Sequence, residues 1–538
     1  MQTPDSDPKS DPARPENPRF LQREPTQPPR WALAPVEGRV LDPATALNVE
    51  GVQPRPTAYV GPRLLVSRDN FAETLDLLRD VARPLGWDVD PEEGGRAEPD
   101  RFTVRRLRIS LASKQAALAP DGWALLQQAR AKYGLERLRG VGLDHVVFAQ
   151  PFEASHPFEA SHPFEASHPF EASHPFEASH PYGRSGTSYA VSTYGVPGSG
   201  GRQPVTYVGP APHRRRDDEL PGRRPVVAIL DTGCAAHPWL DGVVTTTATL
   251  DGSPIGYVDA ATDPDLVGDL AGPLDGSIDP LSGHGTFIAG LVHQGCPDAD
   301  ILSWRVVPSA GPLVESDWIT ALKQIAELVR RDRAGLPGGR AIDVLSLSMG
   351  YYHETPEDAL FDPTLYDVLA ELGRHGVVVV CSAGNDATDR PTFPAGFAPW
   401  SNGAGPVPAS PDRVPIVSVG ALNPNGRTDA LFSNAGQWVR VYVPGAAVMS
   451  TMPALQGGLL PTARTRCLGR VRESIDPDDF RGGFAVWSGT SFAAPYFAGQ
   501  VAAALLERLE GSGRTVSTDE VVQRGWAVVE DLTAIVAP

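Results

Sequence analysis

The sequence predicts two folded units joined by a long linker, and the second unit is expected to be a doubly wound parallel α/β sheet. Three observations predict this. Apolar strand-like runs alternate with helical patterns from residue 225 onward, as a parallel sheet with crossover helices requires. A shorter alternation occupies residues 55–150, and identical repeats separate the two parts. The length of 538 residues and the 41% hydrophobic content suffice for both cores.

The N-terminal part divides into a lead-in and a small domain. Residues 1–45 are rich in proline and charge and are predicted to be a disordered lead-in. Residues 55–150 are predicted to form a small α/β domain, because extended stretches alternate with segments of helical period. In order, the strand, helix, strand, helix and strand are expected at 58–67, 70–85, 102–111, 122–133 and 141–149.

Five identical copies of Pro-Phe-Glu-Ala-Ser-His fill residues 151–180. Proline at every sixth position prevents a continuous helix or a central strand, so residues 151–224 are predicted to be a linker. The repeat could act as a tether, display one short motif in tandem, change its charge with pH or bind a transition metal through its histidines. A tolerated linker lengthened by duplication is the preferred interpretation.

The second unit, residues 225–538, is predicted to hold six buried strands and three principal helices. The strands are expected at 226–230, 300–307, 341–348, 376–381, 414–419 and 439–443, and the helices at 317–331, 364–375 and 491–509. The last helix is apolar nearly all round and is expected to be buried.

Composition excludes several classes of partner. The net charge of −18 argues against nucleic acid and against an anionic membrane surface. No apolar run is long enough to span a membrane, and residues 1–30 contain no stretch of signal-peptide length, so a cytoplasmic location is expected. The four cysteines, Cys234, Cys296, Cys381 and Cys467, lack metal-ligand spacing and are predicted to be free thiols.

Four short blocks carry residues of the types that nucleophilic catalysis needs. They are Asp231-Thr232-Gly233, Gly283-His284-Gly285-Thr286, Ser382-Ala383-Gly384-Asn385 and Gly489-Thr490-Ser491-Phe492-Ala493-Ala494-Pro495. Alone, each has a simpler interpretation: a turn aspartate, a surface histidine, a turn asparagine and a helix cap. Together they offer a nucleophile, a general base, a carboxylate to orient the base and an amide to hold an oxyanion. The glycines beside His284 are expected to leave space for a substrate.

These blocks resemble, in order and in sequence, those of the subtilases, the subtilisin-like serine proteases. The resemblance covers about residues 225–512. It implies that Asp231, His284 and Ser491 are catalytic and that Asn385 helps to form the oxyanion hole. It also implies a substrate-binding site along Ser348, Met349, Gly350, Ser382, Ala383 and Gly384. No metal or cofactor is expected for the chemistry, and calcium is a candidate only for stability.

The predicted function is therefore that of a serine endopeptidase that cleaves polypeptide substrates through an acyl-enzyme. Residues 55–150 resemble, in position and size, an inhibitory prodomain, which predicts a self-processed or autoinhibited precursor (a zymogen). Arg214-Arg215-Arg216 and Arg223-Arg224 are expected to be accessible cleavage sites. The alternative is that the N-terminal domain is a binding or sensing module and the protease is its regulated or silent output.

Two departures from the family pattern bear on specificity and metal binding. Tyr351 and Tyr352 follow Gly350 where small residues are common, so the primary specificity pocket or its approach is expected to differ. The segment between Asp231 and His284 is an enlarged acidic loop. Its carboxylates, such as Asp263 and Asp265, could bind calcium or attract basic substrates, but a solvated acidic loop is the preferred interpretation.

Overall fold

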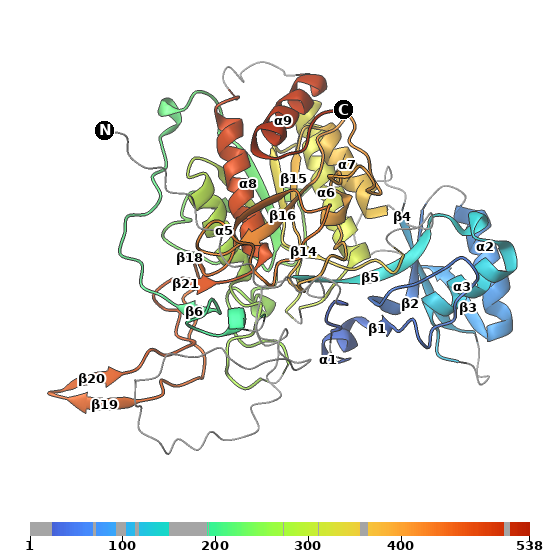
Figure 1. Cartoon of the computed structure of the whole chain (residues 1–538), viewed down its shortest axis with the longest axis horizontal. Helices are drawn as coiled ribbons and strands as arrows, with labels where there is room; N and C mark the ends of the chain where they lie inside the picture. Colours follow the sequence, from blue (N-terminus) through green and yellow to red (C-terminus); the bar gives the residue numbers. More distant parts are fainter. Residues whose placement is uncertain are drawn as a thin grey trace, which may run out of the picture.

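The structure is a computed structural model that describes most of the two folded units. Its described residues are 24–28, 30–67, 71–92, 104–112, 118–149, 191, 193–272, 274–309, 311–355, 364–509 and 517–538. The repeat at 151–180 and the first 23 residues lie outside this set, so the predictions made for them stay predictions. In Figure 1, the N-terminal unit packs against one side of the larger C-terminal unit.

The C-terminal unit is built on a seven-stranded sheet with the order β17-β16-β15-β13-β7-β11-β8. Every neighbouring pair in it is parallel, which confirms the predicted doubly wound fold. Its strands are β7 (Val226–Asp231), β8 (Val244–Thr245), β11 (Asp300–Arg305), β13 (Val344–Leu347), β15 (Val378–Ser382), β16 (Val417–Leu422) and β17 (Val441–Pro444).

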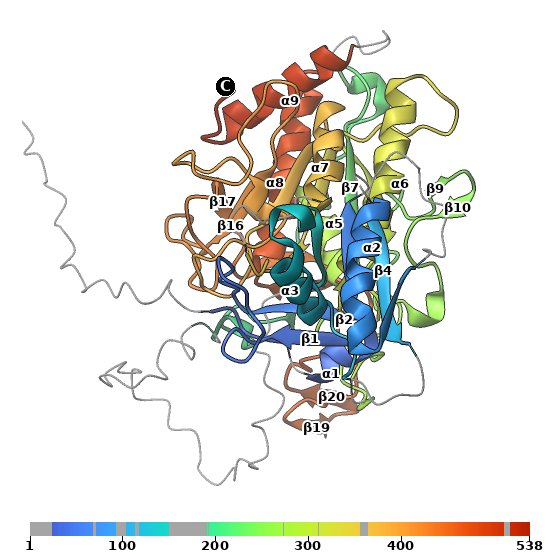
Figure 2. The same cartoon turned by 90° about the vertical axis from the view of Figure 1, so that its right-hand side faces the viewer.

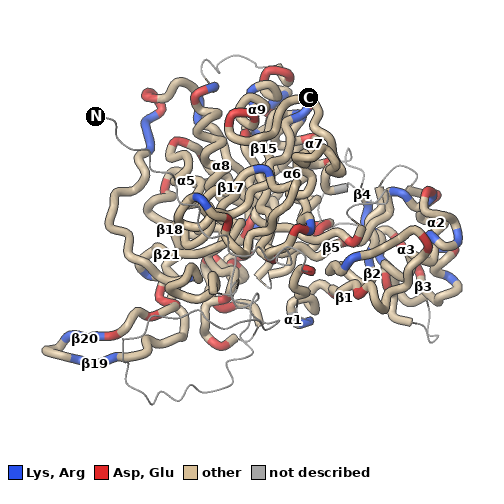
Figure 3. Tube along the Cα trace, in the orientation of Figure 1, with Lys and Arg blue, Asp and Glu red and all other residues tan. Residues whose placement is uncertain are grey.

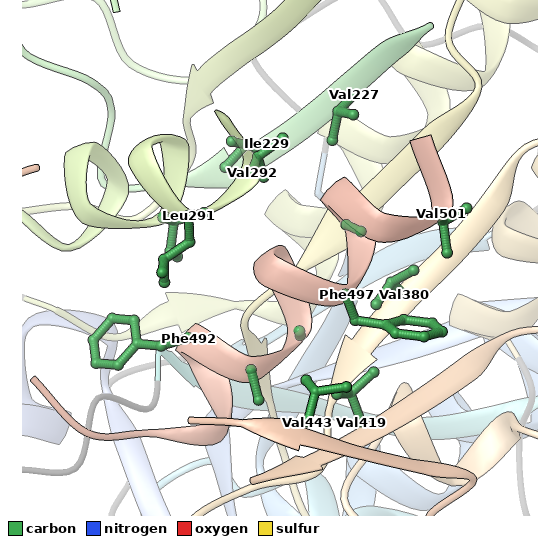
Figure 4. Close-up of a cluster of buried hydrophobic side chains, with 14 of the residues drawn as sticks. Val227, Ile229, Leu291, Val292, Val380, Val419, Val443, Phe492, Phe497 and Val501 are labelled. Atoms are coloured by element: carbon green, nitrogen blue, oxygen red, sulfur yellow. The ribbon is translucent and has the colours of Figure 1, made fainter. Parts of the chain in front are cut away.

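Helices cover both faces of this sheet because its strands are apolar on both sides. Val227 and Ile229 of β7 belong to one buried core, and Ala228 and Leu230 belong to the other. The first core, part of which Figure 4 shows, is closed by α5 (His284–Gly295), α8 (Thr490–Leu506) and α9 (Thr518–Leu532). The second is closed by α6 (Glu315–Arg333) and α7 (Thr364–Arg374). Helix α9 was not predicted.

The N-terminal unit has its own antiparallel sheet, with two helices packed over it, and Figure 2 faces this unit. The elements are β2 (Thr57–Ser67), α2 (Phe71–Ala82), β3 (Trp87–Pro91), β4 (Val104–Leu111), α3 (Gly122–Tyr133) and β5 (Val141–Ala149). Leu64, Leu107 and Leu126 are fully buried in a core separate from those of the C-terminal unit. The predicted alternation is confirmed, apart from β3, which was missed.

The prediction of a disordered lead-in as far as residue 45 is wrong for residues 30–41. A short helix, α1 (Arg30–Leu33), precedes the strand β1 (Gly38–Leu41). Strand β1 pairs with β2, and Leu33 and Leu41 are buried. The proline content misled the prediction because an edge strand needs only a few apolar residues and one partner strand.

Strand β5 joins the two units through backbone pairing. Val146 and Val147 pair antiparallel with β12 (Leu313–Val314), and Phe148 and Ala149 pair antiparallel with β14 (Met349–Gly350). The N-terminal sheet therefore continues onto the edge of the C-terminal unit, on the segment that the sequence predicted would bind substrate.

The part of the predicted linker after residue 192 is attached to the C-terminal unit. Strand β6 (Gln203–Pro204) pairs with β21 (Phe484–Trp487), which in turn pairs with β18 (Val448–Thr451). Ion pairs join Arg214 to Asp300, Arg215 to Asp298, Arg223 to Asp343 and Arg224 to Asp298. Arg214, Arg223 and Arg224 are therefore less accessible than predicted, whereas the side chains of Arg215 and Arg216 are 42% and 74% exposed.

The remaining strands lie in loops of the C-terminal unit. β9 (Thr249–Leu250) pairs with β10 (Ser253–Pro254), and β19 (Arg464–Cys467) pairs with β20 (Arg470–Glu473). The second hairpin projects from the body and carries exposed arginines, as Figure 3 shows. All four cysteines are free, as predicted. No helix of the described ranges is both long enough and apolar enough to cross a bilayer.

Limited trypsin digestion tests the attachment of the linker. We expect early cuts in the β19–β20 hairpin, after Arg464, Arg466, Arg470 or Arg472, because these arginines are exposed. We expect no early cut after Arg214, Arg215 or Arg223, because ion pairs with Asp300, Asp298 and Asp343 hold these side chains on the C-terminal unit and oppose the local opening that cleavage needs. N-terminal sequencing or mass spectrometry of the fragments gives the answer. Early cuts at those three arginines would contradict the described attachment.

Candidate active site

Asp231 ends the buried strand β7 at the carboxyl edge of the sheet, where parallel α/β folds place their sites. Its side chain is fully buried. The carboxylate oxygen Oδ1 accepts a hydrogen bond from the Thr232 backbone N–H at 2.8 Å and lies 2.7 Å from Nδ1 of His284. This bond fixes the imidazole so that Nε2 points away from the carboxylate.

His284 is the first residue of α5 and is also fully buried. Gly283 has φ of 84°, and a Cβ on Gly285 would lie 2.1 Å from the carbonyl oxygen of Gly233. A Cβ on Gly283 would lie 2.6 Å from the side chain of Met452. The two glycines therefore allow the close approach of these neighbours, which replaces the expectation that they leave space for substrate.

Asp265 links the two segments that carry Asp231 and His284, a role the sequence did not predict. Oδ1 of Asp265 accepts from the Thr232 hydroxyl at 2.6 Å, and Oδ2 accepts from the Thr286 backbone N–H at 2.8 Å. Burial raises the pKa of Asp265 to about 6, and the hydrogen bonds from the two threonines oppose this rise. Since both oxygens are engaged within the protein, Asp265 braces the site.

Ser491 is the second residue of α8 and is fully buried. The helix is capped at Gly489 without a side-chain bond, so the interpretation of Ser491 as a helix cap is wrong. Its carbonyl oxygen accepts from the hydroxyl of Ser348 at 2.9 Å. The Phe492 ring lies 5.2 Å from the His284 ring, measured between centroids, so the first turn of α8 lies beside the imidazole. The helix N-terminus favours negative charge there.

Asn385 is tied to the residue that precedes Ser491. Its side-chain oxygen accepts from the backbone N–H and from the hydroxyl of Thr490, both at 2.9 Å. The Thr490 hydroxyl in turn accepts from the backbone N–H of Gly384 at 3.0 Å. Because Thr490 holds the amide oxygen, the donor Nδ2 occupies the other end of the Asn385 amide, as an oxyanion hole requires.

The predicted substrate-binding residues lie on two segments near Ser491. Ser348, Met349 and Gly350 follow β13, and Met349 and Gly350 form β14, which pairs with β5. Ser382 is the last residue of β15, and Ala383 and Gly384 follow it. Asn434 supports the second segment, because its Nδ2 donates to the Ala383 carbonyl at 2.9 Å.

The two tyrosines after Gly350 have different surroundings. Tyr352 donates from its hydroxyl to Asp386 at 2.7 Å and accepts from Nδ2 of Asn434 at 2.8 Å, so it bridges the two substrate-binding segments. Tyr351 is buried and stacks on His145 of the N-terminal unit with 4.3 Å between ring centroids. Tyr352 therefore lies between the predicted substrate-binding segments, and Tyr351 belongs to the contact between the two units.

The chain is similar to known serine proteases. A family model described as "Subtilase family" matches residues 222–524. The chain is 28% identical over 293 residues to "Intracellular serine protease" of Paenibacillus polymyxa, covering 52% of this chain and 66% of that protein. It is 24% identical over 315 residues to "Major intracellular serine protease" of Bacillus subtilis strain 168, covering 56% and 74%. Among solved structures, fervidolysin from Fervidobacterium pennivorans aligns over 89% of this chain and 62% of its own, with 17% identity and a TM-score of 0.45.

The substitution Asp265→Asn tests the bracing role. We expect kcat for peptide hydrolysis to fall about ten- to a hundredfold with KM little changed, because a small misplacement of His284 disrupts proton transfer. Because the pKa of Asp265 is raised in the folded chain, the wild-type protein loses stability as the pH rises from 3.8, the usual pKa of an aspartate, to about 6. The amide of Asp265→Asn does not ionise, so above pH 6 the melting temperature of this variant should not be markedly lower than that of the wild-type chain.

The matched control for Asp265→Asn is Asp275→Asn in the same acidic loop, where the side chain is exposed. It should leave both kcat and the melting temperature unchanged. An unchanged kcat in Asp265→Asn, or a loss fully explained by unfolding, would contradict the bracing role.

Proposed function

This chain belongs to the subtilase family of serine endopeptidases, and we propose that it hydrolyses peptide bonds with Asp231, His284 and Ser491 as its catalytic triad. The observation that carries the proposal is the buried 2.7 Å hydrogen bond between Asp231 and His284, beside the first turn of α8, which contains Ser491. The three groups can supply the nucleophile and both proton transfers, so the proposed chemistry needs no cofactor.

In the first half-reaction, Oγ of Ser491 attacks the carbonyl carbon of the scissile bond and His284 accepts the hydroxyl proton at Nε2. The carbonyl oxygen becomes an oxyanion that accepts from Nδ2 of Asn385 and from the Ser491 backbone N–H. Asp231 stabilises the imidazolium through Nδ1. The C–N bond then breaks as His284 gives its proton to the leaving amine, which leaves an ester on Ser491.

In the second half-reaction, water replaces the amine. His284 removes a proton from the water, whose oxygen attacks the ester carbon, and the same two donors hold the second oxyanion. The C–O bond to Ser491 breaks, and Oγ recovers the proton from His284. The products are a carboxylic acid and the regenerated enzyme.

We further propose that the N-terminal unit inhibits the peptidase in the full chain. A substrate bound in extended form would add an antiparallel strand beside Met349 and Gly350. Strand β5 already pairs with these residues through Phe148 and Ala149, which supports direct competition. The alternative, in which the N-terminal unit is a binding or sensing module and the protease is its regulated or silent output, stays a prediction. Self-processing, a cytoplasmic location and a stabilising effect of calcium stay predictions.

Substitution of Asn385 by alanine tests the oxyanion proposal. Loss of the corresponding donor in subtilisin lowers turnover about a hundredfold to a thousandfold. We expect kcat of Asn385→Ala to fall by a similar factor. KM should change little, because the donor acts mainly on the developing charge. Hydrolysis of a chromogenic peptide gives both constants, with Ser491→Ala as the inactive reference. A fall below threefold would contradict the assignment.

Proline substitutions in β5 test the inhibition. Proline lacks a backbone N–H and cannot donate to β14, so Phe148→Pro or Ala149→Pro should weaken the docked strand. We expect hydrolysis of a short peptide by the full chain to rise severalfold in at least one of the two variants. Phe148→Ala keeps the backbone donor and should rise less. Activity that does not increase in either proline variant, with the fold intact by circular dichroism, would contradict inhibition by β5.

A further inference from the structure

We propose that the contact between the two units contains a zinc site formed by His145, His353 and Glu354. One ligand atom from each of these residues lies within 4.8 Å of those from the other two. His145 belongs to β5 of the N-terminal unit, and the other two follow β14 in the C-terminal unit. All three side chains are at most 3% exposed.

The chemical types of the three ligands indicate which metal would bind. Two imidazoles and one carboxylate suit zinc and similar divalent transition metals, whereas calcium and magnesium prefer oxygen ligands alone. Nε2 of His145 lies 2.8 Å from Oε2 of Glu354, and Nδ1 of His353 lies 3.6 Å from the same oxygen. Nδ1 of His353 accepts from the Thr355 backbone N–H at 3.0 Å, so this nitrogen carries a lone pair and no proton. Binding of a metal at Nδ1 would replace this hydrogen bond.

A second carboxylate orients His145 as zinc sites require. Oε2 of Glu315 lies 2.6 Å from Nδ1 of His145, which leaves Nε2 to face Glu354 and His353. The Tyr351 hydroxyl donates to Oε1 of Glu315 at 2.8 Å, and the Tyr351 ring stacks on His145. A carboxylate on the far nitrogen of a ligating histidine fixes its tautomer and makes it a stronger ligand.

Charge also favours a dication at this place. Glu315 and Glu354 are each 2% exposed, and buried charges are costly unless they are balanced. A protonated His145 balances one of the two carboxylates, whereas a zinc ion with two neutral histidines balances both. Arg390 donates to the His353 carbonyl and pairs with Glu24, so its charge is compensated separately.

The position of the site couples metal binding to docking. His145 directly precedes the β5 residues that pair with β12 and with β14. Only the docked arrangement brings all three ligands together, so zinc stabilises that arrangement by mass action. Under the proposed function, removing zinc would relieve inhibition. The zinc site itself does not depend on the peptidase proposal.

The test uses the full chain carrying Ser491→Ala, so that no self-cleavage separates the units. After removal of metals with a chelator and dialysis, Zn²⁺ or Co²⁺ is added back and bound metal is counted by elemental mass spectrometry. We expect His353→Gln to bind one equivalent fewer than its parent. Co²⁺ should give the visible absorption of a low-coordinate site in the parent, and His353→Gln should lose it.

Matched variants separate this site from other histidines. The five histidines of the repeat are present in every chain, so their contribution cancels in the comparison. His375→Gln removes a histidine that also contacts a glutamate, Glu371, and it should leave the equivalent unchanged. Glu315→Gln should weaken zinc binding about ten- to a hundredfold, as loss of an orienting carboxylate does.

The melting temperature gives a second readout. Zinc should raise the melting temperature of the parent and not that of His353→Gln. Equal metal content and equal cobalt spectra in the parent and His353→Gln would overturn the proposal. A rise in the activity of the wild-type chain after addition of a chelator tests only whether zinc supports inhibition. If no rise occurs, the zinc site is still judged by the metal content and the cobalt spectra. The proposed peptidase function is judged separately by the kinetics of Asn385→Ala.

Discussion

The buried hydrogen bond between Asp231 and His284 is the constraint on which the C-terminal unit depends. A carboxylate and an imidazole can meet at full burial only if the strand and the helix that carry them are held rigidly. The parallel sheet fixes the end of β7, and the packing of α5 against α8 fixes the start of α5. Gly285 then allows the start of α5 to approach the backbone at Gly233, in the segment that follows Asp231, closely enough for the 2.7 Å contact.

The polar groups around this bond form a connected support. Asp265 joins Thr232 to Thr286, and Thr490 joins Asn385 to the turn before Ser491. The two bonds to Asp265 are buried, and the bond from Thr490 to Asn385 is partly buried. Away from water, a satisfied hydrogen bond holds geometry well and an unsatisfied one is costly. The site is thus assembled by short links among residues from β7, the acidic loop, α5, β15 and α8.

Much of the sheet was predictable because buried parallel strands read as continuous apolar runs. The predicted and observed limits of β7, β11 and β15 differ by one or two residues. The pairing of β5 with β14 was not predictable in the same way, since nothing in residues 141–149 alone specifies a partner some 200 residues later. The same limit applies to Asp265, whose partners are distant in sequence, and to β1, which the proline-rich composition concealed.

The contact between the two units lies at the predicted substrate-binding segment. Strand β5 extends one sheet across the contact and pairs with the segment on which an extended peptide would bind. Buried carboxylates and histidines lie on the same strand and its neighbours, so polar groups as well as backbone bonds hold the units together. Release of the N-terminal unit must break both kinds of contact.

The central claim is that His284, oriented by Asp231, activates Ser491. Peptide mapping of the covalent adduct left by a fluorophosphonate tests it most directly, because the reagent marks the activated nucleophile itself. We predict that the adduct of the wild-type chain lies on Ser491 and that His284→Ala forms it far more slowly. An adduct on another residue, or equal labelling of Ser491 in His284→Ala, would contradict the account.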